Sequence, residues 1–223
     1  MNDAYNVDCM EYMRGVPDNF FDLAVADPPY GIVKGFKKSS RVARYGQTKT
    51  ANDDKPTAEY FAELFRVSKN QIVWGYNHLS DMLPPTKEFI FWYKRQPVES
   101  YADGELAWTS YEKTAKCFDY SYFGGVGADD VRIHPMQKPI ALYTWLYQTY
   151  AKPGYKILDT HLGSGSSRIA AYDCGLDFVG CEIDAEYFRK QEKRYEEHIA
   201  QQRMFAPSLI GGNEWLKSDA AER

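Results

Sequence analysis

The chain has 223 residues, 44% hydrophobic and 26% charged, which is the balance of a globular protein with one full core. Its formal net charge of −4 does not indicate a nucleic-acid-binding protein, so such a role would need a local basic segment. The four cysteines form no CxxC pair and indicate neither a zinc site nor a disulfide framework. With no signal-like N-terminus and no long apolar run, we expect a cytoplasmic protein outside the membrane.

Short apolar runs alternate with helical patterns along the chain. We expect strands at residues 21–26, 71–74, 89–93, 156–158 and 177–182, and a weaker one at 117–123. Helices are expected at residues 57–67, 139–150, 166–174 and 184–202. Pro139 suits the first position of its helix, Gly175 ends the third helix, and Asp184 can cap the fourth. This alternation predicts an α/β fold with a mostly parallel sheet covered by helices on both faces.

A glycine-rich turn follows the strand expected at residues 156–158. It reads Asp159-Thr160-His161-Leu162-Gly163-Ser164-Gly165-Ser166-Ser167 and leads into a helix. Glycines let the backbone turn sharply and let a ligand approach, and a helix N-terminus beyond them attracts an anionic group. Glu182 ends the next strand, where an acid can hold both hydroxyls of a ribose. These features predict a nucleoside-containing cofactor without indicating which one.

A second motif, Asp27-Pro28-Pro29-Tyr30, directly follows the strand expected at residues 21–26. Consecutive prolines lack N–H donors but keep their carbonyls free to accept hydrogen bonds. The motif therefore offers a carboxylate and a carbonyl as acceptors beside an aromatic ring. An exocyclic amine of a nucleobase matches it, because it carries two N–H donors on a flat π system.

Together the two motifs resemble the DNA amino-methyltransferases in the permuted motif order called the β class, in particular its small phage and prophage members. Asp8-Cys9 and the run His134-Pro135-Met136-Gln137-Lys138-Pro139 resemble further segments of that family, as do residues 72–77 and 102–108. The resemblance covers roughly residues 5–200 and implies a Rossmann-like methyltransferase fold that uses S-adenosylmethionine.

The resemblance also implies roles for individual residues. The cofactor would be held by Asp8, Cys9, Gln137, Lys138, Asp159, His161, Leu162, Gly163, Ser164, Gly165, Ser166 and Glu182. The catalytic set would be Asp27, Pro28, Pro29 and Tyr30. Asp27 and the Pro28 carbonyl would accept the two N–H groups of a flipped adenine, while Tyr30 stacks on the base. No metal is required by this scheme.

Two features depart from the family. Pro-Phe usually follows the acid of the glycine loop, whereas Thr160-His161 stand here. We interpret His161 as a neutral side chain that packs like the missing aromatic, with a role for its charge as the alternative. No large target-recognition domain fits into residues 94–133. We therefore expect one methyltransferase domain at residues 1–204, with inserted DNA-binding loops at about 31–55 and 94–133 and a tail at 205–223.

A basic segment comes directly after the Asp-Pro-Pro-Tyr motif, and residues 31–51 contain no acid. A charge run is most often a solvated loop, but its position beside the motif favours contact with DNA phosphates. The residues predicted to make these contacts are Lys34, Lys37, Lys38, Arg41 and Arg44. Arg41, Arg44, Arg95 and Gln96 are candidates for base contacts by their chemistry alone.

We thus predict a site-specific DNA adenine-N6 methyltransferase. Methylation of cytosine N4 is the nearest alternative, although the family more often has Ser at the position of Asp27 for that target. Further alternatives are methylation of RNA or protein amines, a non-catalytic DNA-binding module, and an oxidoreductase, which the absence of GxGxxG spacing disfavours. The sequence predicts neither a recognition sequence nor a partner restriction endonuclease, and a homodimer is implied by the resemblance only.

Overall fold

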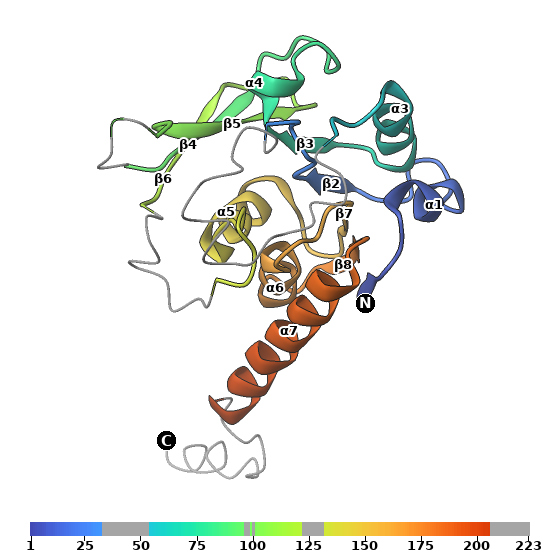
Figure 1. The fold of residues 1–223 in the computed structure, drawn as a ribbon, viewed down its shortest axis with the longest axis vertical. Coiled ribbons are helices and arrows are strands. Elements are labelled where there is room, and N and C mark those ends of the chain that lie inside the picture. Colours follow the sequence, from blue (N-terminus) through green and yellow to red (C-terminus); the bar gives the residue numbers. More distant parts are fainter. Residues whose placement is uncertain (33–53, 96–98, 100, 122–131, 206–223) are drawn as a thin grey trace, which may run out of the picture.

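The computed structural model describes residues 1–32, 54–95, 99, 101–121 and 132–205. In these residues eight strands form one sheet in the order β1-β8-β7-β2-β3-β5-β4-β6 (Figure 1). All neighbouring strands are parallel except where β5 meets β3 and β4. The strands are β1 (Asn2–Tyr5), β2 (Leu23–Ala26), β3 (Gln71–Trp74), β4 (Phe89–Tyr93), β5 (Gly104–Thr109), β6 (Lys116–Asp119), β7 (Lys156–Asp159) and β8 (Asp177–Cys181). The predicted, mostly parallel sheet is confirmed.

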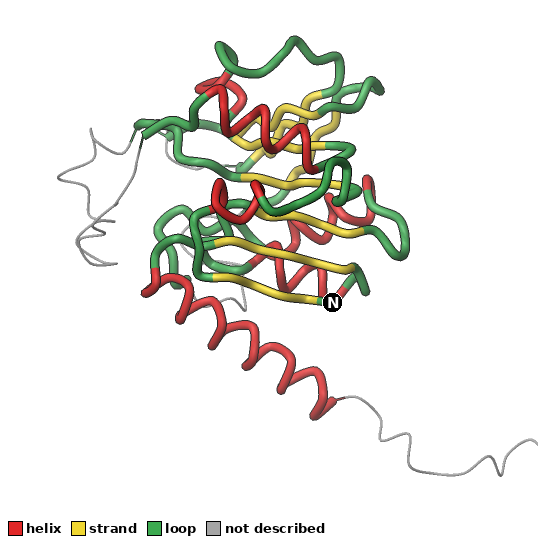
Figure 2. The backbone as a smooth tube through the Cα atoms, turned by 90° about the vertical axis from the view of Figure 1, so that its right-hand side faces the viewer, coloured by secondary structure: helices red, strands yellow, loops and turns green. Residues whose placement is uncertain are grey.

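Helices cover both faces of this sheet. They are α1 (Cys9–Arg14), α3 (Ala58–Val67), α4 (Tyr76–Leu79), α5 (Ile140–Tyr150), α6 (Ser166–Asp173) and α7 (Ala185–Phe205). Helices α5 and α6 pack together on one face, and α1 and α3 pack together on the other, as Figures 1 and 2 show. Helix α7 follows β8 and extends away from the sheet. Among the described helices, none combines the length and the apolarity needed to cross a bilayer.

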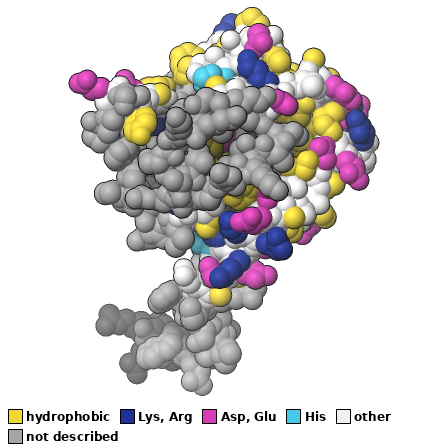
Figure 3. Space-filling view, in the orientation of Figure 1, with side chains coloured by type: hydrophobic (Ala, Val, Ile, Leu, Met, Phe, Trp, Pro, Cys, Tyr) yellow, Lys and Arg dark blue, Asp and Glu magenta, His cyan; other side chains and the backbone are white. Residues whose placement is uncertain are grey.

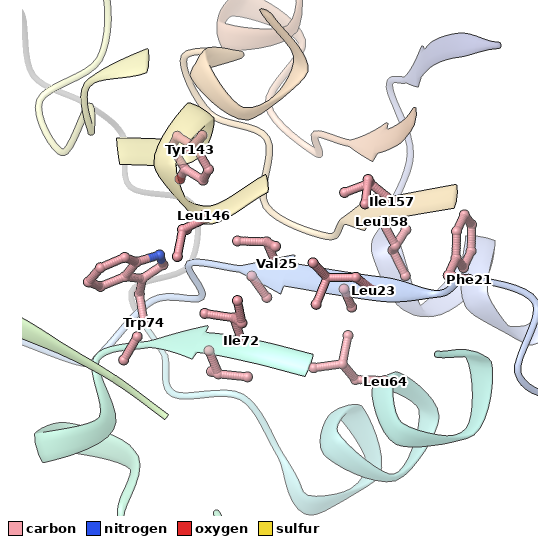
Figure 4. Packing of buried hydrophobic residues seen from close by; sticks show 14 of the residues in the cluster. Phe21, Leu23, Val25, Leu64, Ile72, Trp74, Tyr143, Leu146, Ile157 and Leu158 are labelled. Atoms are coloured by element: carbon pink, nitrogen blue, oxygen red, sulfur yellow. The ribbon is translucent and has the colours of Figure 1, made fainter. Parts of the chain in front are cut away.

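The core explains why the central strands are almost entirely apolar. All residues of β2 and β3 are buried, because a parallel strand with helices on both faces has no solvent-facing side. Figure 4 shows Leu23 and Val25 of β2 between Ile72 on one side and Leu158 on the other. Helix α3 supplies Leu64 to this cluster, as its periodicity predicts.

Several expectations about the elements need correction. Strand β1, helices α1 and α4, and strand β5 were not predicted. Pro139 precedes α5 as its N-cap with extended backbone (φ −70°, ψ 148°) and is not its first helical residue. Strand β6 ends at Asp119, so the strand expected at residues 117–123 is shorter, and residues 122–131 lie outside the described part.

The order of the strands indicates where a ligand would bind to the sheet. The chain runs from β2 through α3 to β3 in one direction, and from β7 through α6 to β8 in the other. Strands β2 and β7 are neighbours, so the topology reverses between them. In open α/β sheets, ligands bind in the crevice outside the carboxyl ends of the strands at such a reversal.

Candidate active site

Five parallel strands bring the predicted motifs to one edge. Strands β1, β8, β7, β2 and β3 all point the same way. Asp8 follows β1, Glu182 follows β8, the glycine loop follows β7, and Asp27 follows β2. The motifs predicted from distant parts of the sequence therefore meet at the topological reversal.

Asp27 belongs to a chain of ion pairs with alternating charge. The Tyr30 hydroxyl donates to Asp27 Oδ1, and Lys138 Nζ donates to Asp27 Oδ2 at 2.5 Å. The same ammonium lies 3.1 Å from Glu105 Oε2, and Lys94 donates to Glu105 Oε1. Two acids and two bases thus neutralise one another, and both oxygens of Asp27 are held in place.

Burial and charge set the protonation of this chain. Burial alone would lower the pKa of Lys138, but the carboxylates of Asp27 and Glu105 outweigh it and raise that pKa above its ordinary value. Burial raises the pKa of Glu105, yet Lys138 and Lys94 outweigh it and hold that pKa at about 2. Burial and the charge of Asp27 raise the pKa of Tyr30 well above its usual range. At neutral pH, Tyr30 and Lys138 are therefore both donors toward Asp27. Each carboxylate oxygen retains lone-pair capacity for a further N–H.

The ring of Tyr30 is tightly enclosed. It is 9% exposed and stacks on His78 with ring centroids 5.4 Å apart and planes at 18°. Gly75 has φ +81°, and a Cβ there would lie 2.1 Å from the Tyr30 ring. Only glycine fits between β3 and this ring. Because His78 covers one face of Tyr30 in this structure, stacking of Tyr30 on a flipped base remains a prediction.

The glycine loop is shaped by two left-handed residues, Gly163 (φ +53°) and Gly165 (φ +73°). A Cβ at Gly163 would meet the His134 ring at 3.8 Å, an ordinary van der Waals contact, so glycine is favoured there by the left-handed backbone and not by crowding. Glu182 holds the loop, because its Oε2 accepts from Gly163 N and its Oε1 from Asp184 N, both at 2.8 Å. Burial raises the pKa of Glu182 above its ordinary value.

Other loop residues are buried beneath the site. Asp159 accepts from Ser167 Oγ and, at 3.0 Å, from His161 N, and burial raises its pKa to about 7. The hydroxyls of Ser164 and Ser166 lie 3.1 Å apart, and both residues are buried. Leu162 is also buried. The structure thus gives these predicted cofactor residues a part in shaping the loop.

The remaining predicted cofactor residues lie outside the glycine loop in the sequence. Asp8 Oδ1 caps α1 by accepting from Met10 N at 2.7 Å, while Oδ2 has no partner among the described residues. Cys9 is half-buried, and burial raises the pKa of its thiol to about 12. Gln137 Oε1 accepts from Ile133 N at 2.9 Å. Lys138, by contrast, forms ion pairs with Asp27 and Glu105.

The site at the carboxyl ends of the parallel strands fits a nucleoside. It offers the carboxylates of Asp8 and Glu182 as acceptors. Ile183, directly after Glu182, is 56% exposed and presents an apolar surface beside the acid. Among the described residues, no group of three or more His, Cys, Asp or Glu could hold a metal ion.

Five residues of this site were not predicted to be functional: Glu105, Lys94, Gly75, His78 and Ile183. In the sequence, Glu105 stands directly before a short apolar stretch, and Gly75 directly follows an expected strand. Neither signal says which distant side chain the residue meets.

The predicted DNA contacts fall mostly outside the described part of the chain. Lys34, Lys37, Lys38, Arg41 and Arg44 lie in residues 33–53, and Gln96 lies in residues 96–98. Arg95 is described, and its guanidinium makes a bidentate contact with Asp119 at 2.5 Å. On the face shown in Figure 3, basic and acidic side chains of the described residues are interspersed.

Known proteins resemble this chain in sequence and in structure. A family model described as DNA methylase, of the N6/N4 methyltransferase type, matches residues 66–193. DNA adenine methyltransferase YhdJ of Escherichia coli K12 is 24% identical over 239 residues, which cover 85% of this chain and 81% of YhdJ.

Two solved structures extend the comparison. The crystal structure of M1.HpyAVI in complex with SAM has a TM-score of 0.58 and 22% identity, over 87% of this chain and 98% of that one. PvuII DNA methyltransferase, described as cytosine-N4-specific, has a TM-score of 0.60 and 14% identity, over 88% and 89%. These likenesses confirm the predicted Rossmann-like fold.

Proposed function

The chain belongs to the DNA methylase family and is an S-adenosylmethionine-dependent DNA methyltransferase of exocyclic amines, and we propose that its target is the N6 amine of adenine. The observation that carries the proposal is the position of Asp27. This carboxylate lies at the topological reversal, next to the strand that bears the glycine loop, and both its oxygens are held by donors. An acceptor so placed suits an amine that must meet a methyl donor.

The chemistry asks the protein to activate a poor nucleophile, because the lone pair of the adenine amine is delocalised into the ring. When bound, S-adenosylmethionine supplies an electrophilic methyl group. Asp27 and the Pro28 carbonyl accept the two N–H groups, so the nitrogen becomes tetrahedral with its lone pair toward the methyl group. The same acceptors stabilise the positive charge that develops on nitrogen. Asp27 need not be a strong base, because the proton leaves after the nitrogen has become acidic.

Lys138 supports this role by holding the Asp27 carboxylate in place. A protonated carboxyl would present one donor and would oppose one of the two N–H groups. The Lys138 ammonium donates to Asp27 Oδ2 at 2.5 Å, so this oxygen serves as an acceptor. Glu105 balances the charge of Lys138, so the pocket carries no excess positive charge that would repel the developing cation.

Adenine is preferred over cytosine on two grounds. An acid at position 27 is the residue that the family more often pairs with adenine, and YhdJ is named as an adenine methyltransferase. Duplex DNA should be methylated in vitro by the purified protein and then digested to nucleosides for mass spectrometry. We expect N6-methyladenine, whereas N4-methylcytosine would replace the proposed target.

The catalytic assignment has its own test. Asp27→Ala should abolish methyl transfer and leave the affinity for S-adenosylmethionine within a few-fold of the parent. Near-normal turnover by this variant would refute the mechanism. A parent protein that binds the cofactor and DNA but forms no product on any duplex or single-stranded substrate would instead point to a non-catalytic module.

We further propose that the basic segment after Gly31 binds DNA phosphates beside the flipped base. Neutralising Lys37, Lys38 and Arg41 should weaken DNA binding, and each lost phosphate contact should reduce the slope of log affinity against log salt by about 1. Cofactor affinity measured without DNA should stay unchanged. An unaltered salt slope would leave the segment a solvated loop.

A further inference from the structure

The two residues that depart from the family, Thr160 and His161, form a hydrogen-bond chain with helix α3. Tyr60 Oη lies 2.7 Å from Thr160 Oγ1, which lies 2.9 Å from His161 Nδ1. The rings of Tyr60 and His161 pack edge to face, with centroids 5.5 Å apart. Tyr60 and Thr160 are buried, at 4% and 3% exposure, while His161 keeps part of its surface open.

The donor and acceptor roles in these hydrogen bonds follow from counting protons. Each hydroxyl has one proton, and Tyr60 Oη has no described partner other than Thr160. If Tyr60 donates to Thr160, the Thr160 proton is free to go to His161 Nδ1. If Thr160 donated to Tyr60 instead, the Tyr60 proton would be buried without an acceptor. If Thr160 accepted from both neighbours, its own buried proton would have no described acceptor, and both arrangements are unfavourable. His161 Nδ1 is therefore an acceptor, and a neutral ring carries its proton on Nε2.

The surroundings of His161 keep the ring neutral and leave Nε2 available. Burial lowers its pKa to about 4, although Asp27 and Asp8 act in the opposite direction. These two carboxylates are the charges that the ring faces, one in the predicted target site and one in the predicted cofactor site. Nε2 has no hydrogen-bond partner among the described residues and is not enclosed, so an unpaired N–H donor is presented there.

We propose that His161 Nε2–H donates a hydrogen bond to an acceptor atom of bound S-adenosylmethionine, and that Tyr60 and Thr160 hold it in this tautomer. The cofactor is preferred to the target base because His161 lies in the glycine loop, two residues before Gly163, whose N–H contacts Glu182. Its backbone N–H is fixed by Asp159 at 3.0 Å, so the ring stands on a rigid part of the loop. A phenylalanine at this position could pack but could not donate. The inference deepens the proposed function and rests on it for the identity of the ligand.

Two substitutions separate donation from packing. His161→Phe keeps an aromatic ring without the donor, and His161→Gln places an amide N–H near the position of Nε2. By calorimetry on DNA-free protein, His161→Phe should bind S-adenosylmethionine about 3- to 10-fold more weakly, as for the loss of one neutral hydrogen bond. His161→Gln should recover most of that affinity. Unchanged affinity of His161→Phe would overturn the proposal.

The tautomer can be observed directly in the protein without ligand. The chain has 4 histidines, so long-range ¹H–¹⁵N correlation spectra are simple, and His161→Phe identifies the relevant signals. At pH 7 we expect the pattern of an Nε2–H imidazole, which should persist in Thr160→Ser and be lost in Thr160→Val. If Thr160 acts through His161, adding Thr160→Val to His161→Phe should not weaken cofactor binding further. An Nδ1–H pattern in the parent protein would refute the argument.

These readouts need no methyl transfer, so they fail independently of the proposed function. If the parent methylates no adenine but shows the Nε2–H pattern and the loss in His161→Phe, the assignment of His161 stands and the N6 target falls. If His161→Phe binds the cofactor normally and loses only affinity for adenine-containing DNA, the donor serves the base and the cofactor contact is refuted.

Discussion

Replacing Lys138 by methionine tests whether the ion pairs around Asp27 control the stability of the protein and its methyl transfer. The substitution keeps an unbranched side chain and removes the ammonium that lies 2.5 Å from Asp27 and 3.1 Å from Glu105. The Lys138 side chain is 4% exposed, against 17% for Asp27 and 25% for Glu105. The variant therefore leaves two mostly buried carboxylates close together with Lys94 as their remaining counter-ion.

The expected loss of stability follows from this burial. Removing one partner of a buried ion pair costs about 3–5 kcal/mol, and we expect the lower end, about 3 kcal/mol, because both carboxylates keep some contact with water. Lys190→Met is the matched control. Its ammonium lies 2.6 Å from Glu186 in an exposed i,i+4 pair, for which a change of about 0.5 kcal/mol or less is expected. Urea unfolding at pH 7 measures both variants.

The pH dependence gives a second readout. Glu105 has a pKa of about 2 in the folded protein, below the ordinary 4.5, so its stabilising effect is present above about pH 4.5 and lost as pH falls toward 2. The stability difference between the parent and Lys138→Met should therefore shrink over that range. Methyl transfer by the variant should be strongly reduced, because Asp27 loses the donor that holds its Oδ2.

Cofactor affinity should stay within a few-fold in Lys138→Met, because the ammonium contacts Asp27 and Glu105. Wild-type turnover together with a stability change no larger than that of Lys190→Met would refute this reasoning. A loss of cofactor affinity with normal turnover at saturation would place Lys138 in the cofactor site, as the family resemblance implies.

Three further predictions test the loops. Gly154→Ala, at φ +82° with nothing within 4 Å of the added Cβ, should lose about 1 kcal/mol of unfolding free energy. Gly75→Ala, at φ +81°, should lose more than Gly154→Ala, because its Cβ would lie 2.1 Å from the Tyr30 ring, and it alone of the two should lose methyl transfer in a product assay. The pKa of Asp159 is about 7 in the folded protein, so between about pH 4 and 7 the native protein holds a proton that the unfolded chain has released, and stability declines as pH rises. Asp159→Asn should flatten this decline in a pH series of urea unfolding. Glu182→Ala should weaken S-adenosylmethionine binding by roughly 10-fold in calorimetry, and unchanged affinity would contradict its role.

The sequence predicts those elements in which burial produces a continuous run of apolar residues. Strands β2 and β3 are buried on both faces, so each reads as an unbroken apolar run between turn signals. Strand β1 has no such run, because Asn2–Tyr5 pairs only with β8 at the sheet edge and is partly exposed. Its position is determined by its partner, which lies more than 170 residues away in the chain.

The same distinction separates the predicted from the unpredicted site residues. Gly163 and Gly165 are recognisable because their function is a local backbone shape, with φ of +53° and +73°. Asp27 is recognisable because adjacent prolines mark it. Glu105 stands on β5, the antiparallel strand that the periodicity did not reveal, and its meeting with Lys138 depends on the tertiary fold. No local pattern encodes such a pairing.

The buried charges are better understood as a functional arrangement than as a source of stability. Desolvating two acids and two bases is unfavourable, and well-packed apolar side chains in place of a buried ion pair are often neutral or stabilising. Breaking the arrangement is costly, but forming it gains little. What the chain of Asp27, Lys138, Glu105 and Lys94 does provide is an ionised acceptor in a pocket of nearly zero net charge. That combination suits an amine that arrives neutral and becomes positively charged, because the acceptor must be charged while its surroundings must not repel the product.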